Sequence, residues 1–266
     1  MLNFIKYEIK GSYRFILGVL ALTTILNIGN FFYLDKVNYT GPSAIGGIFL
    51  GFSFLVIFGM MIATFFYIVN LFRKDLYEDR GYLTFTLPIS SQKILASKVL
   101  VAFLWFTVVT IGFILSNILA VNLISSNVIL SDIYRFFMVT DIPWKEIFAL
   151  FIGIITSSII TLLIIFFSMT VGRVSIKSKK FKGVWFFIFI FISIIHSLIN
   201  VKVIEITPYY FNISTLGFEY INNYFFGATF NDGVFIVNLG SILFNILTLL
   251  GFFFGTSYLM ENHIDL

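Results

Sequence analysis

The stretch FRKDLYEDRGYLTFTLPIS, residues 72–90, carries six charged residues in its first half, and the chain on both sides of it is almost wholly apolar. Of all 266 residues, 59% are hydrophobic and 11% are charged, against about 25% charged residues in soluble domains. A soluble core could not bury this much apolar surface, because surface-to-volume scaling limits burial. The sequence therefore predicts a protein whose main solvent is lipid, interrupted here by one dense polar segment.

Six apolar stretches flank and follow this segment, and each is long enough to cross a bilayer, which needs about 20 residues per helix. They predict spans at 13–34, 44–71, 94–124, 146–172, 184–201 and 236–260. No shift in composition marks a separate soluble domain, so residues 1–266 are expected to form a single transmembrane domain. The predicted fold class is an all-α polytopic membrane protein.

The basic residues predict the orientation of these spans, since Lys and Arg concentrate on the cytoplasmic side. With the N-terminus inside, the inner segments hold 13 of the 17 basic residues, and the outer ones hold only Lys36, Arg135, Lys145 and Lys202. We therefore expect both termini in the cytoplasm. The run RVSIKSKKFK, residues 173–182, is then an inner-face contact with lipid rather than a nucleic-acid patch.

The first dozen residues show a helical pattern of their own. One face carries Leu2, Ile5, Ile9 and Tyr13, and another carries Asn3, Lys6, Lys10 and Arg14. This pattern predicts an amphipathic helix over residues 1–12, lying in the inner membrane interface before the first span. The alternative is that these residues are only the cytoplasmic flank of that span.

Several functional classes are disfavoured by what the sequence lacks. Cysteine is absent, which excludes disulfides and thiolate metal sites, and none of the 13 acidic residues lies at the centre of a predicted span. Ion-coupled carriers usually keep an ionisable group at membrane depth. There is also no GxxxxGK[ST] loop, HExxH or GxSxG sequence. We therefore assign no catalytic residue and no metal ligand, and disfavour an ion-driven carrier or a membrane enzyme.

Neutral polar residues do occur within the predicted spans. Such groups typically form hydrogen bonds between helices, and this is the favoured role for any single one of them. The alternative is that they line a cavity for an amphipathic substrate. The candidates for that role are Asn27, Ser53, Asn117, Ser157, His196 and Asn245.

The segment 72–80 is too charged to enter lipid. Its pattern predicts a short helix on which Leu76 or Tyr77 is buried while the charged side chains face water or a partner protein, with Gly81 at the helix end. Residues 82–87 are expected to be extended or re-entering before Pro88. The alternative is a solvated inner loop that only stabilises the topology.

Residues 73–98, RKDLYEDRGYLTFTLPISSQKILASK, resemble the loop of bacterial ABC-2-type transporter permeases. There a charged segment precedes an acid–Gly–Tyr–Leu run, and a Thr-Leu-Pro-Ile/Val-Ser sequence opens the third span. The matching residues are Glu78, Asp79, Gly81, Tyr82, Leu83, Thr86, Leu87, Pro88, Ile89 and Ser90. Arg80 departs from the pattern. The expected interfacial helix, six spans and cytoplasmic termini fit the same family, which implies re-entrant helices within 201–238.

The resemblance implies a permease subunit of an ABC exporter in the bacterial cytoplasmic membrane. It implies a second permease chain, the same or homologous, and two ATP-binding subunits that hold ATP and Mg, so this chain would be no enzyme and bind no cofactor or nucleic acid. The implied cargo is hydrophobic or amphipathic (a peptide antibiotic, drug or lipid), as in multidrug or antimicrobial peptide resistance. A non-transporting scaffold or sensor is the alternative. The implied coupling residues, with a weaker contact at 173–183, are Arg73, Lys74, Asp75, Leu76, Tyr77, Glu78, Asp79, Arg80, Gly81 and Tyr82.

Overall fold

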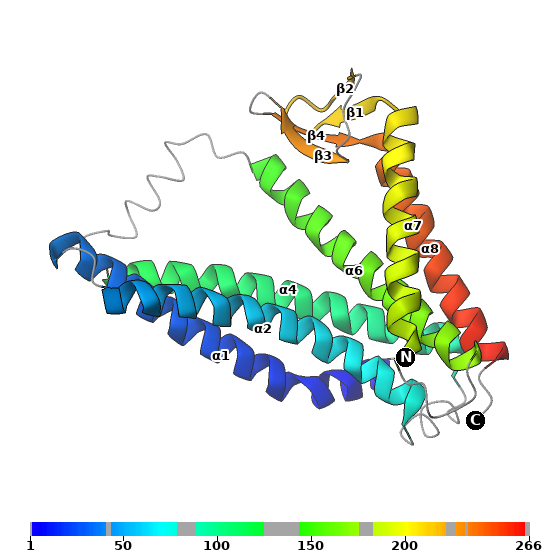
Figure 1. Ribbon diagram of the computed structural model, residues 1–266, viewed down its shortest axis with the longest axis horizontal. Helices are drawn as coiled ribbons and strands as arrows, with labels where there is room; N and C mark the ends of the chain where they lie inside the picture. The colour runs from blue at the N-terminus through cyan, green and yellow to red at the C-terminus, as the bar shows by residue number, and fades with distance from the viewer. Residues whose placement is uncertain are drawn as a thin grey trace. The chain divides into compact units, whose positions relative to one another are not determined.

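The computed structural model describes residues 2–40, 44–78, 89–124, 144–175, 183–221, 227–231 and 234–263 (Figure 1). Its helices are α1 (Leu2–Thr40), α2 (Ala44–Tyr77), α4 (Ser91–Ile124), α6 (Trp144–Ser175), α7 (Val184–Ile206) and α8 (Leu239–Asn262). Between α7 and α8 lie four strands, β1 (Tyr209–Asn212), β2 (Gly217–Tyr220), β3 (Ala228–Asn231) and β4 (Val234–Asn238).

All six helices are long and apolar enough to cross a membrane, which confirms the prediction of a multi-pass membrane protein. The candidate spans are Phe4–Tyr33, Leu50–Tyr77, Ser91–Ala120, Trp144–Val174, Val184–Ile206 and Leu239–Asn262. Helices suit this solvent because each backbone N–H and C=O group is satisfied within the same segment, where lipid offers no hydrogen-bonding partner.

The chain divides into two compact units. One contains Leu2–Asn70 and Leu100–Ile142, and the other contains Leu71–Val99 and Pro143–Leu266. Helices α2 and α4 contribute to both units: their long apolar parts belong to the first, and their ends on either side of residues 79–88 belong to the second.

In the first unit, α1, α2 and α4 run side by side (Figure 1). The ring of Phe15 stacks on that of Tyr67 with centroids 4.2 Å apart, which joins α1 to α2. The indole of Trp105 donates a hydrogen bond to Ser12 Oγ at 2.9 Å, which joins α4 to α1. Polar groups thus find partners across the helix contacts, as expected inside a membrane protein.

The helix predicted over residues 1–12 is not separate from the first span, because α1 is one continuous helix from Leu2 to Thr40. Lys6 and Lys10 are exposed as expected. The buried face of the same turns carries Glu8, Ser12 and Ile16, and Ser12 is held by Trp105. These residues are therefore the beginning of the first long helix.

In the second unit, α6 contacts both α7 and α8. Phe167 and Phe252 meet edge to face with centroids 5.2 Å apart, which joins α6 to α8. At Gly172 an added Cβ would lie 3.3 Å from the Cβ of Trp185, so the missing side chain lets the start of α7 approach α6 closely.

The expectation of re-entrant helices within 201–238 was wrong for the described residues, which form the end of α7 and a four-stranded antiparallel sheet of order β2-β1-β4-β3. Tyr210 is fully buried and forms a small core with Ile204 and Ile236. Along β1, Tyr210 and Asn212 are buried, whereas Tyr209 and Phe211 are more exposed. Asp232-Gly233, between β3 and β4, is a dipeptide favoured in two-residue hairpin connections, and this local sequence signal was available.

The sheet is fastened to α8 by Asn238, whose side chain is fully buried. Its Oδ1 accepts a hydrogen bond from the backbone N–H of Ser241 at 2.9 Å and so caps α8. Its Nδ2 donates to the carbonyl oxygen of Thr207 at 2.7 Å. Because an added Cβ at Gly240 would lie 1.9 Å from Thr207 Oγ1, this junction admits no side chain there.

The sheet and the end of α2 lie at opposite ends of α6 (Figure 1). The hydroxyl of Ser214, in the β1–β2 turn, donates a hydrogen bond to Glu146 in the first turn of α6. The hydroxyl of Tyr77, at the end of α2, bonds to the carbonyl oxygen of Met169. At 1.5 Å per residue, Glu146 and Met169 are separated by about 35 Å along α6, close to the ~30 Å of a bilayer core.

We predict that Asn238→Ala lowers the free energy of unfolding by about 2 kcal/mol, because it removes a helix cap and leaves the Thr207 carbonyl without this donor. The measurement is the thermal midpoint of the purified chain in detergent. The matched control is Asn262→Ala, which removes an exposed amide bonded to its own helix and should change little. Equal effects of the two variants would contradict the role of Asn238.

Sided labelling tests the arrangement of α6 and the expected orientation together, since the chain has no native cysteine. Glu78→Cys and Lys202→Cys place thiols at opposite ends of the second unit, at positions whose side chains are 49% and 71% exposed. With cytoplasmic termini, a membrane-impermeant maleimide should label the Lys202→Cys variant in intact cells and the Glu78→Cys variant only after permeabilisation. Labelling of both from one side would contradict the arrangement, and the reverse pattern would contradict the orientation.

Candidate functional site

The described part of the predicted coupling segment is the C-terminal end of α2, residues 72–78, which we call the α2 end. The predicted coupling residues Asp79, Arg80, Gly81 and Tyr82 lie outside the described residues, as do residues 176–182 of the predicted second contact.

The α2 end is anchored on α6 by apolar side chains. Phe72 is 1% exposed, and its ring stacks on that of Phe166 with centroids 4.0 Å apart. Leu76 is buried, and the hydroxyl of Tyr77 donates to the carbonyl oxygen of Met169 at 2.8 Å. The prediction that Leu76 or Tyr77 is buried against another part of the protein is confirmed.

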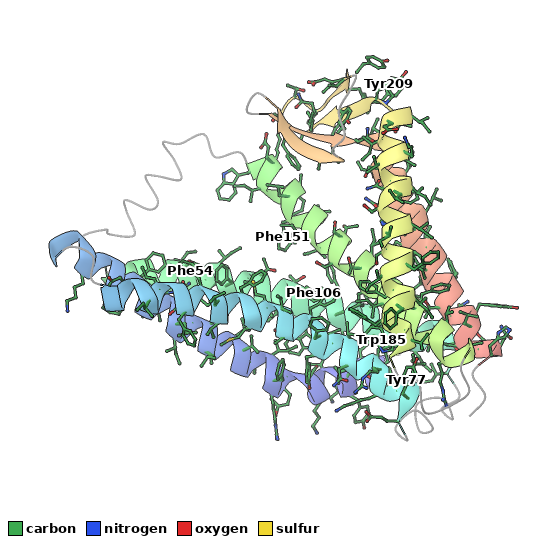
Figure 2. All side chains as sticks on the ribbon, in the orientation of Figure 1. Phe54, Tyr77, Phe106, Phe151, Trp185 and Tyr209 are labelled. Carbon is green, nitrogen blue, oxygen red and sulfur yellow. The ribbon has the colours of Figure 1, made fainter. Side chains whose placement is uncertain are left out.

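The ring of Tyr77 lies where α6 and α7 meet (Figure 2). A Cβ at Gly172 would come within 3.4 Å of the Tyr77 hydroxyl and 3.3 Å of Trp185, so glycine leaves the space that both aromatic residues approach. The guanidinium of Arg173 lies 5.9 Å from the centroid of the Tyr77 ring, a distance at which a cation is attracted to an aromatic face. The α2 end is thus held by polar, aromatic and apolar contacts at once.

The remaining charged side chains of the α2 end reach the surface. Arg73 and Glu78 form an ion pair at 3.8 Å, with side chains 37% and 49% exposed. Lys74 is half-buried. A surface pair of this kind adds at most about 1 kcal/mol to stability. The anchored helix end therefore presents both signs of charge at its surface.

The expectation that all charged residues of this segment face water or a partner protein is wrong for Asp75. Its side chain is 2% exposed and forms an ion pair with Lys98 of α4, which is 5% exposed. The reason is helical spacing: Asp75 follows Phe72 by three positions and so lies on the same buried face. Lys98 could not be identified from the sequence. Its pairing with Asp75 depends on how the ends of α2 and α4 meet, which the local sequence does not show.

The pair joins the two helix ends that flank residues 79–88. Burying two charges costs solvation energy that their attraction only roughly repays, so such a pair adds little net stability but strongly favours the geometry in which both charges are satisfied. Asp75 and Lys98 therefore fix the position of the α2 end relative to α4.

Three of the residues proposed to line a cavity belong to the first unit. Asn27 donates a hydrogen bond to Ser116 Oγ at 3.0 Å, between α1 and α4. Asn117 donates to the carbonyl oxygen of Phe113 in its own helix at 2.8 Å. Ser53, on α2, is fully buried. The contact of Asn27 is of the interhelical packing kind, which was the favoured role.

The second unit holds the other three, which are Ser157, His196 and Asn245. The ring of His196 stacks on Phe244 of α8 with centroids 5.1 Å apart, and one turn away Asn200 accepts a hydrogen bond from Ser241 at 3.0 Å. Asn245 is half-buried on α8, while Ser157 is exposed on α6. The α7–α8 contact thus carries a short polar strip, and the six candidate residues divide between the two units.

The α2 end carries charged side chains of both signs at its surface. Among the described residues, no group of three or more His, Asp or Glu side chains is placed to hold a metal ion. The arrangement places charged groups at the surface of a helix end whose other face is bound to α6 and α4.

We predict that replacing one member of the buried pair, as in Asp75→Leu or Lys98→Met, lowers the free energy of unfolding by about 3 kcal/mol, because the remaining charge is buried without its partner. The double variant Asp75→Leu/Lys98→Met should recover most of this loss. The measurement is a double-mutant cycle of thermal midpoints in detergent, with the exposed Glu78→Gln as control. Additive effects of the two single changes would contradict the pairing.

Comparisons of the chain with protein-family models, with curated proteins and with solved structures found no match.

Proposed function

We propose that this chain is the permease subunit of an ABC exporter in the bacterial cytoplasmic membrane, driven by separate ATP-binding subunits. The proposal rests first on the α2 end, a charged helix terminus bound to α6 by Phe72 and Tyr77. It rests secondly on the resemblance of residues 73–98 to the corresponding loop of ABC-2-type permeases. A terminus that is rigidly held on one face and charged on the other suits contact with a soluble motor.

The contacts of α6 give a path for transmitting force. A displacement of the α2 end acts on α6 through Phe166 and Met169. From α6 it reaches α8 through Phe167, and α7 through the close approach at Gly172. Because packed helices shift as rigid elements, motion imposed at this end is delivered to the other end of α6, where the sheet lies.

The partners follow from this role. Two ATP-binding subunits would hold ATP and Mg²⁺ and contact the α2 end together with residues 79–82, and a second permease, identical or homologous, would complete the transporter. The described spans are apolar with scattered Asn, Ser and Thr groups, which suits a hydrophobic or amphipathic cargo. A peptide antibiotic, a drug and a lipid are the candidate classes.

The first test is affinity purification of the tagged chain from its native host in mild detergent, with co-purifying proteins identified by mass spectrometry. We expect a near-stoichiometric ATP-binding protein. Recovery of this chain alone, under conditions in which a known membrane complex of that host survives, would favour a non-transporting scaffold or sensor.

The second test separates recognition from folding by exchanging charges. In Arg73→Glu/Glu78→Arg the two charges change places, so the net charge and the possibility of an ion pair are kept while the surface pattern is inverted. We expect recovery of the ATP-binding protein to fall at least tenfold, because complementary charges become like charges. Asp75 is left unchanged because its reversal would disturb the buried pair with Lys98.

The matched control is Lys202→Glu/Glu205→Lys, which exchanges the exposed ion pair at the opposite end of α7, where the two groups lie 2.6 Å apart. It should leave recovery of the ATP-binding protein unchanged. Equal recovery with both exchanges would show that Arg73 and Glu78 take no part in the contact. Equal loss with both would attribute the effect to general instability.

A further inference from the structure

Two buried polar side chains in the first unit make no hydrogen bond within the described residues. Asn30 on α1 is 3% exposed, and both atoms of its amide are without a hydrogen-bond partner. Ser53 on α2 is fully buried, and its hydroxyl has no partner either. Since a buried polar group without a partner costs free energy, such groups are rare in folded proteins.

Ser53 is unusual because a serine or threonine in a helix has an acceptor at hand in the carbonyl oxygen four residues earlier. Thr64, on the same helix and almost as buried, uses that acceptor and donates to Met60 at 2.9 Å. The Ser53 hydroxyl does not. Its orientation therefore points to a partner that is not part of its own helix.

The contacts between α1 and α2 place Asn30 and Ser53 at the same height along the helix axes. Helices α1 and α2 are antiparallel, and Tyr67 meets both Gly11 and Phe15, so residues whose numbers add to about 80 face each other. Asn30 and Ser53 satisfy this relation.

Helix α4 contributes to the same region. It runs parallel to α1, and the pairs Ser12–Trp105 and Asn27–Ser116 fix its register. The fully buried Ala120 is then level with Asn30. One turn away, Asn27 donates to Ser116, so all three helices direct small or polar side chains into one layer of their contact.

The layer lies within about one helical turn, some 5 Å, of the ends of the candidate spans at Tyr33, Leu50 and Ala120. Asn30, Ser53, Ala120, Asn27 and Ser116 carry no charge, so an ion bound there would lack a compensating charge, which is costly in a buried site. An amide offers both donors and acceptors, and a hydroxyl does the same. The complementary ligand is therefore small and neutral, and itself both donates and accepts hydrogen bonds.

We propose that Asn30 and Ser53, with the Asn27–Ser116 pair beside them, form a closed site between α1, α2 and α4 for such a ligand. A water molecule has this chemistry, and so does the hydroxyl group of a lipid. The site is independent of the transport function proposed above, and its test needs no ATP-binding subunit.

The test measures the thermal midpoint of the purified full chain in two variants. Ser53→Ala removes the hydroxyl, and Asn30→Leu replaces the amide by an apolar side chain of nearly the same shape. If a ligand is bound, each change removes hydrogen bonds to it and lowers the thermal midpoint, by about 2–6 °C. If the site is empty, each change removes an unsatisfied polar group and leaves the midpoint unchanged or raises it. Thr64→Val is the matched control and should have little effect, since its hydroxyl is satisfied within its own helix.

Two conditions distinguish the sources of the ligand. One sample is washed extensively in synthetic detergent, and the other then receives a total lipid extract of the host. Destabilisation by either variant in the washed sample assigns the site to water, and destabilisation that emerges only with the lipid extract assigns it to a lipid hydroxyl. If neither variant lowers the midpoint beyond the control in either sample, the proposal is overturned.

Discussion

The scarcity of hydrogen-bonding partners in lipid is the constraint on which the rest of this structure depends. It requires each membrane-crossing segment to satisfy its own backbone groups, and the six long helices do so. Many hydroxyls inside them follow the same rule, as when Thr110 and Thr170 donate to carbonyl oxygens four residues earlier. The only strands in the described part of the chain lie between the ends of α7 and α8, where segments leave the apolar spans.

Polar groups that form hydrogen bonds or ion pairs with another helix therefore do most to specify how the helices pack together. Asn27 and Ser116 join α1 to α4, and Asp75 and Lys98 join the ends of α2 and α4. Each contact is directional and costly to break, whereas apolar side chains can be exchanged and repacked without loss of the fold. The polar contacts therefore set the register that apolar packing alone leaves loosely defined.

The α2 end combines both kinds of contact, and this combination makes it the strongest candidate for a functional surface. Phe72 and Tyr77 hold it on α6, and the buried pair holds it to α4. Arg73 and Glu78 remain at the surface. In the proposed permease, a helix end fixed on two neighbours would pass on a force that a flexible charged loop would absorb.

The sequence by itself determined the six spans, because the membrane imposes length and hydropathy on each segment separately and no knowledge of its neighbours is needed. It also determined that Leu76 or Tyr77 would be buried beside charged residues, since that follows from local helical spacing. For the described part of residues 201–238, the re-entrant helices expected from family analogy were wrong, although the Asp232-Gly233 pair was a local sequence signal for a hairpin. Only the tertiary structure decided that Asp75 is buried on Lys98, that Gly172 admits Tyr77 and Trp185, and that Asn30 and Ser53 share a level. These facts depend on which helix faces meet and in what register, and that is a property of pairs of segments distant in the sequence.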